Sequence, residues 1–358
     1  MRNSKFLVLM MATAVFVCGV LFAGGGAKNI FMSAAIFSSG LQMMKITSRK
    51  AGGNTPVKNE PSAEQTKDSK PSDVSYADEQ QQSPVFLPAE RPTDVETGDI
   101  KTVSLETSAG NSSADGIHYN NTTGVDIDVP SLLAEGLPFT IEQSSEPQVL
   151  IYHTHGTECY SDSDSGYYIK ENDSTRSTDT SKNTIRVGDA IAEVLNNNGI
   201  VTINDRTMHD KDSYTGSYSR SEKTVREYLE KYPSIKVVID GHRDSITQSN
   251  GTKIKPTAEI NGKKAAQVMV LAGCESGDVT NYPNWMENLR FNLLLQRRLE
   301  GDYPGLARTM SFKSCKYNFN IINGSILLEI GTEANTLDEA IYSGQLIGEA
   351  LVKVFKGQ

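Results

Sequence analysis

The stretch 149-VLIYHTHGTE-158 joins four apolar or aromatic residues directly to a polar run that contains His153, His155 and Glu158. A short apolar run of this kind is typical of a strand buried on both faces, as in a parallel sheet. In open α/β sheets, ligands bind beyond the carboxyl ends of such strands. The stretch therefore predicts both a fold class and the position of a functional site.

Apolar residues further along the chain alternate between short runs and helical spacing. Strands are expected near 200–203, 235–240, 265–271 and 326–330, and helices near 185–198, 225–232, 289–299 and 337–354. Strands that alternate with helices indicate an α/β sheet covered on both faces. We therefore expect residues 147–358 to form one α/β domain with a mostly parallel sheet.

Three of the expected strands end in groups that can do chemistry. The first ends in His153 and His155, a later one carries the segment Asp240–Asp244 around His242, and the last ends in Glu329. Parallel strands bring their carboxyl ends to one edge of the sheet. Three of the five histidines of the chain lie in the first two of these segments, which favours a built site over scattered polar residues.

Zinc suits this set of ligands, because imidazoles and a carboxylate at three positions leave a fourth for water. His155 and Glu158 have a His-x-x-Glu spacing, and a distant His242 completes a two-histidine, one-carboxylate set. Glu329 is then free to act as general base and acid, although Glu158 and Glu329 can exchange these roles. His153 is two residues from His155, so both can bind metal, or one can bind substrate.

Polar neighbours of these residues have two interpretations each. Asp240 and Asp244 either orient His242 or cap the following turn. Arg243 either pairs with a carboxylate of the substrate or with Asp244. A serine hydrolase site built from Ser245 is disfavoured, because three residues of one loop cannot take a Ser-His-Asp geometry.

Composition sets broad limits on function. The formal net charge of −9 argues against nucleic acid as the main partner. The four cysteines include no C-x-x-C pair, and Cys159, Cys274 and Cys315 are interpreted as structural rather than as a disulfide framework.

The N-terminus carries a targeting pattern. Arg2 and Lys5 precede an uncharged stretch over 6–23, and about 18 helical residues span roughly 27 Å, close to a bilayer core. We expect a membrane anchor over 1–27, with its N-terminus in the cytoplasm and the rest of the chain outside. A cleaved secretory signal is the alternative, and both export the protein. Residues 28–146, polar over most of their length, are expected to form a juxtamembrane segment and a flexible stalk.

Three motifs together resemble the stage II sporulation protein P family. They are 150-LIYHTHGTECY-160, 238-VIDGHRDS-245 and 327-LLEIGTEANT-336, and they occur in the family's order across the expected domain. The resemblance implies an N-acetylmuramoyl-L-alanine amidase fold with zinc, which cleaves the amide between stem peptide and glycan in peptidoglycan, with possible action on peptide cross-links. It also implies work at the septum of the sporulating cell during engulfment. The implied partners are a lytic transglycosylase, stage II sporulation protein D, and a membrane protein, protein M.

The resemblance also implies roles for individual residues. One of His153 or His155, together with His242, corresponds to the zinc ligands, with Glu329 as the catalytic carboxylate. The related amidases read Asp-Pro-Gly-His-Gly at the first motif, which favours His155. They take a glutamate ligand from the start of the next helix, where this chain has Asn183, so Glu158 is the expected substitute.

The same residue pattern is compatible with two other functions. A zinc carboxypeptidase or endopeptidase uses the same residue types, and mass spectrometry of digested cell walls separates it from an amidase. A non-catalytic tethered module that recruits or activates a partner is the third hypothesis.

Overall fold

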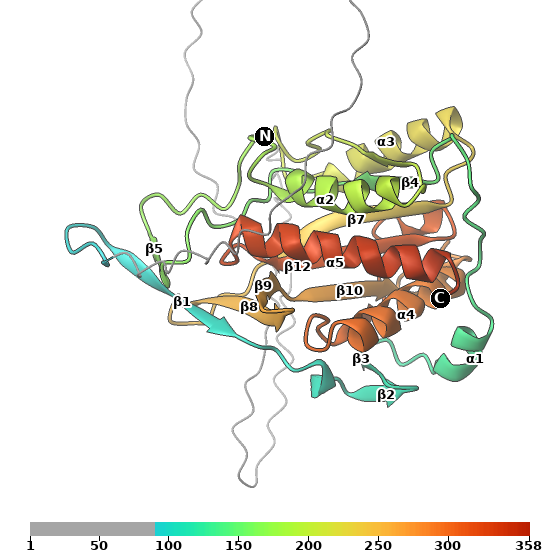
Figure 1. The fold of residues 1–358 in the computed structure, drawn as a ribbon, viewed down its shortest axis with the longest axis horizontal. Helices are drawn as coiled ribbons and strands as arrows, with labels where there is room; N and C mark the ends of the chain where they lie inside the picture. Colours follow the sequence, from blue (N-terminus) through green and yellow to red (C-terminus); the bar gives the residue numbers. More distant parts are fainter. Residues whose placement is uncertain (1–89) are drawn as a thin grey trace, which may run out of the picture. The chain divides into compact units, whose positions relative to one another are not determined.

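Two β-sheets and five α-helices make up residues 90–358, the part of the chain that the computed structural model describes (Figure 1). The strands are β1 Thr97–Val103, β2 Ser112–Ala114, β3 Ile117–Asn121, β4 Val149–Tyr152, β5 Tyr167–Ile169, β6 Thr202–Asn204, β7 Val237–Asp244, β8 Lys253–Ile260, β9 Lys263–Ala266, β10 Val268–Gly273, β11 Met310–Lys313 and β12 Ser325–Thr332. The α-helices are α1 Val129–Ala134, α2 Thr184–Asn197, α3 Ser217–Lys231, α4 Trp285–Asp302 and α5 Leu337–Phe355, and two 3-10 turns are η1 Thr107–Ala109 and η2 Phe319–Ile321.

The larger sheet has the strand order β2-β3-β11-β10-β12-β7-β4-β6. Strands β12, β7, β4 and β6 run parallel to their neighbours in this order, as the sequence predicts. However, β10 is antiparallel to β12, and β2 is antiparallel to β3. The prediction of a mostly parallel sheet is therefore wrong, and the sheet is mixed. An apolar run shows that a strand is buried, but it does not show in which direction the strand runs.

Two antiparallel pairs, β2 with β3 and β8 with β9, are hairpins of strands that follow each other in the sequence. Asp115-Gly116 joins β2 to β3, and Asn261-Gly262 joins β8 to β9; all four residues have positive φ between 51° and 78°. Asp-Gly and Asn-Gly favour the tight turns that match the twist of a hairpin, because both positions need positive φ. These dipeptides are the sequence signals for antiparallel pairing.

The smaller sheet has the order β5-β1-β8-β9 and leads into the larger one at Gln267. Gln267 lies between β9 and β10, is fully buried, and hydrogen-bonds through its side-chain amide to the backbone of Leu105 and to Gly305. The single strand expected over 265–271 is thus two strands in two different sheets. A buried polar residue with all its groups satisfied marks the point where the chain changes sheet.

The segment 97–134, expected within the stalk, belongs to the folded unit. β1 pairs with β8, β3 pairs with β11, and the side chains of Ile117, Val129 and Leu133 lie in the main hydrophobic core. The expected domain boundary at residue 147 is therefore too late. Apolar residues in this segment are few, and the alternation of Val125, Ile127 and Val129 is too short to predict a folded unit by itself.

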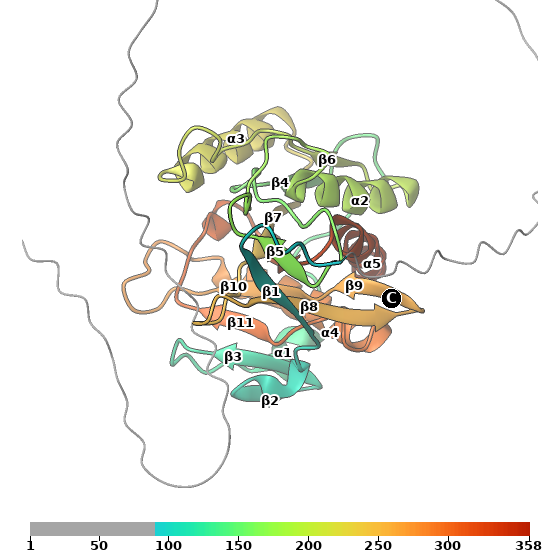
Figure 2. The same ribbon diagram turned by 90° about the vertical axis from the view of Figure 1, so that its left-hand side faces the viewer.

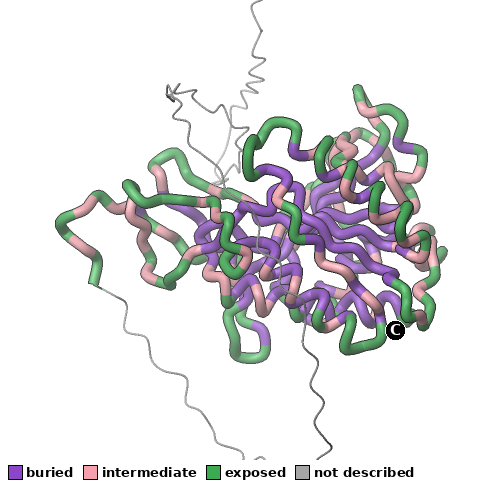
Figure 3. The backbone as a smooth tube through the Cα atoms, turned by 90° about the horizontal axis from the view of Figure 1, so that it is seen from above, coloured by how far each residue is buried: buried purple, intermediate pink, exposed green. Residues whose placement is uncertain are grey.

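Helices cover both faces of the larger sheet, as the sequence predicts (Figure 2). Alternate residues of β4 point to opposite faces: Val149 and Ile151 join the core under α2, α4 and α5, whereas Leu150 and Tyr152 pack beneath α3. This alternation follows from the two-residue period of a strand. The central strands are buried along their length (Figure 3).

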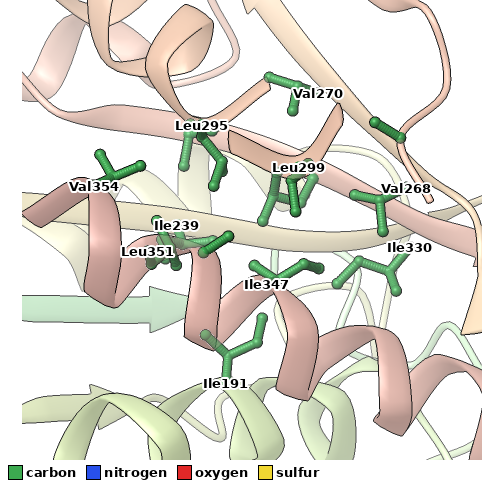
Figure 4. Close-up of a cluster of buried hydrophobic side chains, with 14 of the residues drawn as sticks. Ile191, Ile239, Val268, Val270, Leu295, Leu299, Ile330, Ile347, Leu351 and Val354 are labelled. Atoms are coloured by element: carbon green, nitrogen blue, oxygen red, sulfur yellow. The ribbon is translucent and has the colours of Figure 1, made fainter. Parts of the chain in front are cut away.

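The core is deepest where α5 crosses α2. Ile347 and Leu351 of α5 face Ile191 of α2 and Ile239 of β7 (Figure 4). Gly348 allows this close approach, because a Cβ atom there would lie 2.7 Å from Cβ of Val194. α5 itself begins at a capping box, in which the Thr336 side chain accepts from the Glu339 amide and the Glu339 carboxylate accepts in return.

The expected membrane anchor over 1–27 and the first part of the expected stalk lie outside the described residues. Within residues 90–358, none of the helices combines the length and the apolar character needed to cross a membrane.

Candidate functional site

The site lies where β4, β7 and β12 run side by side. Tyr152, the last residue of β4, pairs with Asp240 of β7, and His242 of β7 pairs with Glu329 of β12. This register brings the segment after β4 next to His242 and Glu329. The three segments that the sequence singles out are thus neighbours at one edge of the sheet.

His155, Glu158 and His242 come together from two of these segments. Nδ1 of His242 lies 3.6 Å from Oε2 of Glu158, and the rings of His155 and His242 lie 5.3 Å apart between centroids, at 82° to each other. All three residues are less than 9% exposed. Glu158 also accepts a hydrogen bond from the backbone N–H of Arg243 at 3.2 Å, which fixes its carboxylate against β7.

Glu158 precedes α2 by 26 residues in the sequence but lies next to the first residue of that helix in space. The resemblance assigned a glutamate ligand to the start of this helix. The backbone N–H of Thr184, the first residue of α2, donates to the carbonyl of Glu158 at 2.9 Å. Asn183 caps the helix instead, because its side-chain oxygen accepts from the Ile185 amide. Glu158 thus lies beside the N-terminus of α2, and its role as the substitute for that glutamate stays a prediction.

The His153 side chain points to the face of the sheet opposite to the one where His155, Glu158 and His242 lie. Its Nδ1 lies 2.8 Å from the carbonyl oxygen of Gly241, and its Nε2 lies 3.0 Å from Oδ1 of Asn204. The ring is fully buried beneath α2, and both nitrogens already have partners. The structure therefore separates His153 from His155 and Glu158. The assumption that both histidines point the same way fails, because the extended conformation ends at Tyr152.

Asp240 positions His242 from below. Its carboxylate accepts hydrogen bonds from the backbone N–H and the hydroxyl of Thr154, and its Oδ1 lies 3.0 Å from Nε2 of His242. Burial opposes the charge on Asp240, but the nearby His242 and the Thr154 hydrogen bonds lower the pKa of Asp240 below its ordinary value. Of the two interpretations of Asp240, the geometry favours the orientation of His242.

The charges around His242 favour a cation. Burial alone would lower the pKa of His242, but Asp240 and Glu158 outweigh it and raise that pKa well above the ordinary value. Carboxylates that favour a proton on an imidazole also favour a metal ion bound to it. The local electrostatics thus suit a metal as well as a proton.

Glu329 lies on β12 beside this group. Its Oε2 is buried and has no hydrogen-bond partner among the described residues. Burial, followed by the negative charge of Asp244, raises the pKa of Glu329 to about 8. A carboxyl group in this range can both accept and donate a proton near neutral pH, which is what general acid–base catalysis requires.

Arg243 serves neither of the two purposes expected of it, whereas Asp244 takes one of its two expected roles, that of a cap. The Arg243 guanidinium donates to the backbone carbonyls of Cys159, Asp244 and Thr175, and only 6% of the residue is exposed. It therefore holds the loop after the first motif against β7, and it is not available to a substrate carboxylate. Asp244 accepts from the Ser245 amide and pairs with Arg308 at 2.9 Å, so it caps the end of β7.

Four residues of the site do not belong to any motif. They are Asp210, Arg176, Tyr214 and Tyr218. Oδ2 of Asp210 lies 3.7 Å from Nδ1 of His155, and Arg176 forms an ion pair with Asp210. The rings of Tyr214 and Tyr218 lie against the ring of His155. Asp210 accepts from the amide and hydroxyl of Thr157, and the neighbouring His155, Thr157 and Arg176 offset its burial and lower its pKa to about 2. One signal could have found Asp210: it lies six residues beyond the end of β6, another strand of the same parallel group.

No three histidine, cysteine or acidic side chains within residues 90–358 already stand in the geometry of a metal site. The chemistry of the donors nevertheless fits zinc: His155, His242 and Glu158 are nitrogen and oxygen ligands of the right kind. Nδ1 of His155 and Nε2 of His242 face the carboxylates of Asp210 and Asp240 at 3.7 and 3.0 Å, which leaves the opposite nitrogen of each ring as the candidate metal ligand. Nδ1 of His242 also lies 3.6 Å from Oε2 of Glu158, as expected for two ligands that share one ion.

The fold and the site define an α/β protein whose sheet presents two histidines and several carboxylates beyond the ends of its central strands. A family model described as Stage II sporulation protein P matches residues 33–352. The chain belongs to this family.

The similarity to individual relatives and solved structures is limited in sequence identity. Stage II sporulation protein P of Bacillus subtilis (strain 168) is 31% identical over 202 residues, which cover 53% of this chain and about half, 47%, of the relative. Among solved structures, the N-acetylmuramoyl-L-alanine amidase from Clostridium difficile 630 has a TM-score of 0.36 and 14% identity, covering 60% of this chain and 97% of that chain. The amidase AmiC2 of Nostoc punctiforme has a TM-score of 0.32 and 12% identity, with the same two coverages.

Proposed function

We propose that the protein is a zinc-dependent peptidoglycan hydrolase that acts as an N-acetylmuramoyl-L-alanine amidase. The observation that carries the proposal is the convergence of His155, Glu158 and His242 beside Glu329. The pKa of Glu329 is raised to about 8, so this carboxyl group can gain or lose a proton near neutral pH. Membership of the sporulation family supports the bacterial cell wall as the setting.

His155, Glu158 and His242 would hold the metal. When bound, zinc would polarise the scissile carbonyl and acidify the attacking water. Asp240 holds His242 in its ring orientation through the 3.0 Å contact, with Thr154 fixing the carboxylate in turn. Asp210 lies in the corresponding position behind His155. Carboxylates behind metal-binding histidines commonly fix the ring and strengthen the ligand.

Glu329 would move the proton. It lies opposite His242 on the neighbouring strand, so its carboxylate can accept a proton from the attacking water. The same group can then donate that proton to the leaving amine of the stem peptide, because its pKa of about 8 lies close to neutral pH.

We also propose the cellular setting that the resemblance implies. The protein would act on the cell-wall side of a membrane at the septum of the sporulating cell, anchored by its N-terminal segment. Stage II sporulation protein D and protein M would be its partners there. The family's printed description supports sporulation as the process.

Digestion of purified cell walls with the full chain tests the activity. Intact stem peptides released from glycan are expected if the protein is an amidase, whereas shortened or uncrosslinked stems would indicate the peptidase alternative. The products are identified by mass spectrometry.

Two variants and one control test the roles. Glu329→Gln should abolish release while zinc content stays as in the wild type, and His242→Ala should lose both. His118→Ala is the matched control, because His118 lies outside the site and contacts Glu300. Undiminished release by a zinc-free His242→Ala protein would overturn the enzymatic proposal and favour a binding module.

A further inference from the structure

One side of the histidine pair is covered by an aromatic ring and a cation. The Tyr214 ring stacks on His155 with centroids 4.3 Å apart and an angle of 6°. The Arg176 guanidinium lies over the Tyr214 ring, 5.0 Å from its centroid. Arg176 is anchored through NH1, which donates to Asp210 and Thr157, and its NH2 lies 4.0 Å from Oε1 of Glu158, while 41% of its side chain remains exposed. A guanidinium has five N–H donors, so this anchor leaves others for a ligand.

The other side of the histidine pair is covered by uncharged aromatic rings. The Tyr218 ring runs nearly parallel to that of His242, with centroids 6.4 Å apart, and Tyr317 stacks on Tyr218 at 5.2 Å. The side-chain amide of Asn318 donates to the Tyr218 carbonyl and to the Ser221 hydroxyl, which ties the Tyr317 loop to α3. Both Tyr317 and Asn318 have positive φ.

The exposure of these tyrosines is unusual in the described part of the chain. Only three large hydrophobic side chains of residues 90–358 stand out into solvent, and two of them, Tyr214 at 57% and Tyr317 at 39%, flank the histidines. The third, Met286, lies on α4. Exposed aromatic rings on both sides of a candidate site are better explained by ligand contact than by packing.

The two sides differ in charge. The Tyr214 side carries the exposed guanidinium of Arg176. On the Tyr317 side, the preceding residue Lys316 is basic, and its ammonium group donates to the carbonyl of Thr280. An exposed guanidinium suits a carboxylate, whereas the exposed Tyr317 ring, stacked on Tyr218, suits an uncharged ring with apolar C–H faces and hydroxyl groups.

We propose that these two sides set the direction in which the substrate crosses the site. The saccharide lies on Tyr317, which Tyr218 supports from behind, and a free carboxylate of the stem peptide binds Arg176, beside Tyr214. The bond between sugar and peptide then lies over His155 and His242. This inference rests on the proposed function, because it assumes a substrate that is a sugar on one side and an anionic peptide on the other.

Binding of the two halves of the substrate, measured separately by calorimetry, tests the direction. The probes are tetra-N-acetylglucosamine, which is an uncharged saccharide, and a free stem peptide with its carboxylates. Full-length Glu329→Gln protein serves as the background, so that catalysis does not interfere. Tyr317→Ala should weaken saccharide binding by roughly three- to tenfold and leave peptide binding unchanged, while Tyr317→Phe should retain it.

Arg176 is tested from both the protein and the ligand. Arg176→Gln should weaken peptide binding by about five- to tenfold and leave saccharide binding unchanged. A peptide with its carboxylates converted to carboxamides should bind the unsubstituted background as weakly, and the two changes should not add. A purely structural role of Arg176 would not produce this dependence on the peptide's charge. Peptide binding should also weaken with salt, whereas saccharide binding should not.

Controls and outcomes separate this inference from the proposed function. Met286→Ala and Arg226→Gln remove an exposed apolar side chain and an exposed ion-paired arginine elsewhere, and should change neither affinity. Equal weakening of both probes by each variant, a reversed pattern, or no binding of either probe would overturn the proposed direction. The expected pattern without any release from cell walls would support the direction and overturn the hydrolase.

Discussion

His153 illustrates how a residue of a functional motif can serve the fold. Its ring fits between two glycines: a Cβ atom on Gly241 would lie 2.8 Å from the ring, and one on Gly188 would lie 2.8 Å from Nε2. The ring links β7 to Asn204 at the end of β6 through its two hydrogen bonds. His153, Gly188 and Gly241 therefore form one packing unit beneath the site.

A methyl group on Gly241 should disturb this unit. Gly241→Ala is expected to destabilise the protein by about 1–3 kcal/mol, because the closely packed ring must move. Urea denaturation measures the change. The double variant with His153→Ala should lose less than the sum of the single variants, since the clash is then absent. Strict additivity would show that the ring and the glycine are not coupled.

Glu329 should make the metal-free protein sensitive to alkaline pH. Its pKa is raised from an ordinary 4.5 to about 8 in the folded state, so the folded protein holds this proton more tightly than the unfolded chain. Its contribution to stability is full below pH 4.5 and is lost as the pH rises through 8. In chelator, Glu329→Gln should therefore melt higher than the wild type at pH 8, with a smaller difference at pH 5.5.

Thermal melts at both pH values decide this point. A variant that is equally or less stable than the wild type at pH 8 would show that Glu329 is not strained by its environment. The expected gain in stability with a loss of hydrolysis is the pattern of a residue kept for function.

The residues of the site were predictable in part. His155, Glu158 and His242 could be found from their spacing after apolar runs, and they are brought together. Asp210 has only its position shortly after β6 as a signal, and Tyr214 has none, because both lie on a loop that returns to the site from beyond β6. The turn of the chain after Tyr152, which sends His153 and His155 to different faces, also leaves no trace in the residue pattern.

At the scale of elements, the contact between α2 and α5 depends on small residues. Gly348→Leu should destabilise the protein by about 1–3 kcal/mol, because the side chain would enter space already filled by Val194. The matched control is Gly301→Ala in α4, where nothing lies within 4 Å of the new Cβ. That change should stabilise by up to about 1 kcal/mol through helix propensity. Chemical denaturation of both variants measures the difference, and similar effects of the two would contradict the packing argument.

Long amphipathic helices and buried central strands could be predicted from the sequence, and short edge strands could not. α2, α4 and α5 follow helical spacing, β4 is a continuous apolar run, and β12 is apolar from Ile326 to Leu328. By contrast, β2 and β5 have only three residues each, and none of their six residues is buried. Such strands exist because a neighbour offers them hydrogen bonds, which is information that no local pattern contains.

At the scale of the whole molecule, the fold needs residues well before the first motif. A fragment that begins at Pro147 would lack β1, β3 and the core residues Ile117, Val129 and Leu133. Each buried side chain of this size contributes roughly 1.5–3 kcal/mol. We therefore expect this fragment to be much less stable than one that begins at Glu90.

Calorimetry of the two fragments compares them directly. A fragment from Pro147 that melts cooperatively at the same temperature as the longer one would show that the early strands are dispensable. Poor folding of the shorter fragment would also make it unsuitable for metal analysis.

The position of β1 has a mechanical consequence. β1 is hydrogen-bonded to β5 on one side and to β8 on the other, and the chain enters the folded unit through it. A force applied to the chain before Thr97 would therefore load these two ladders in the small sheet first. The histidine site, held by β4, β7 and β12 in the larger sheet, would be shielded from that force until β1 gave way.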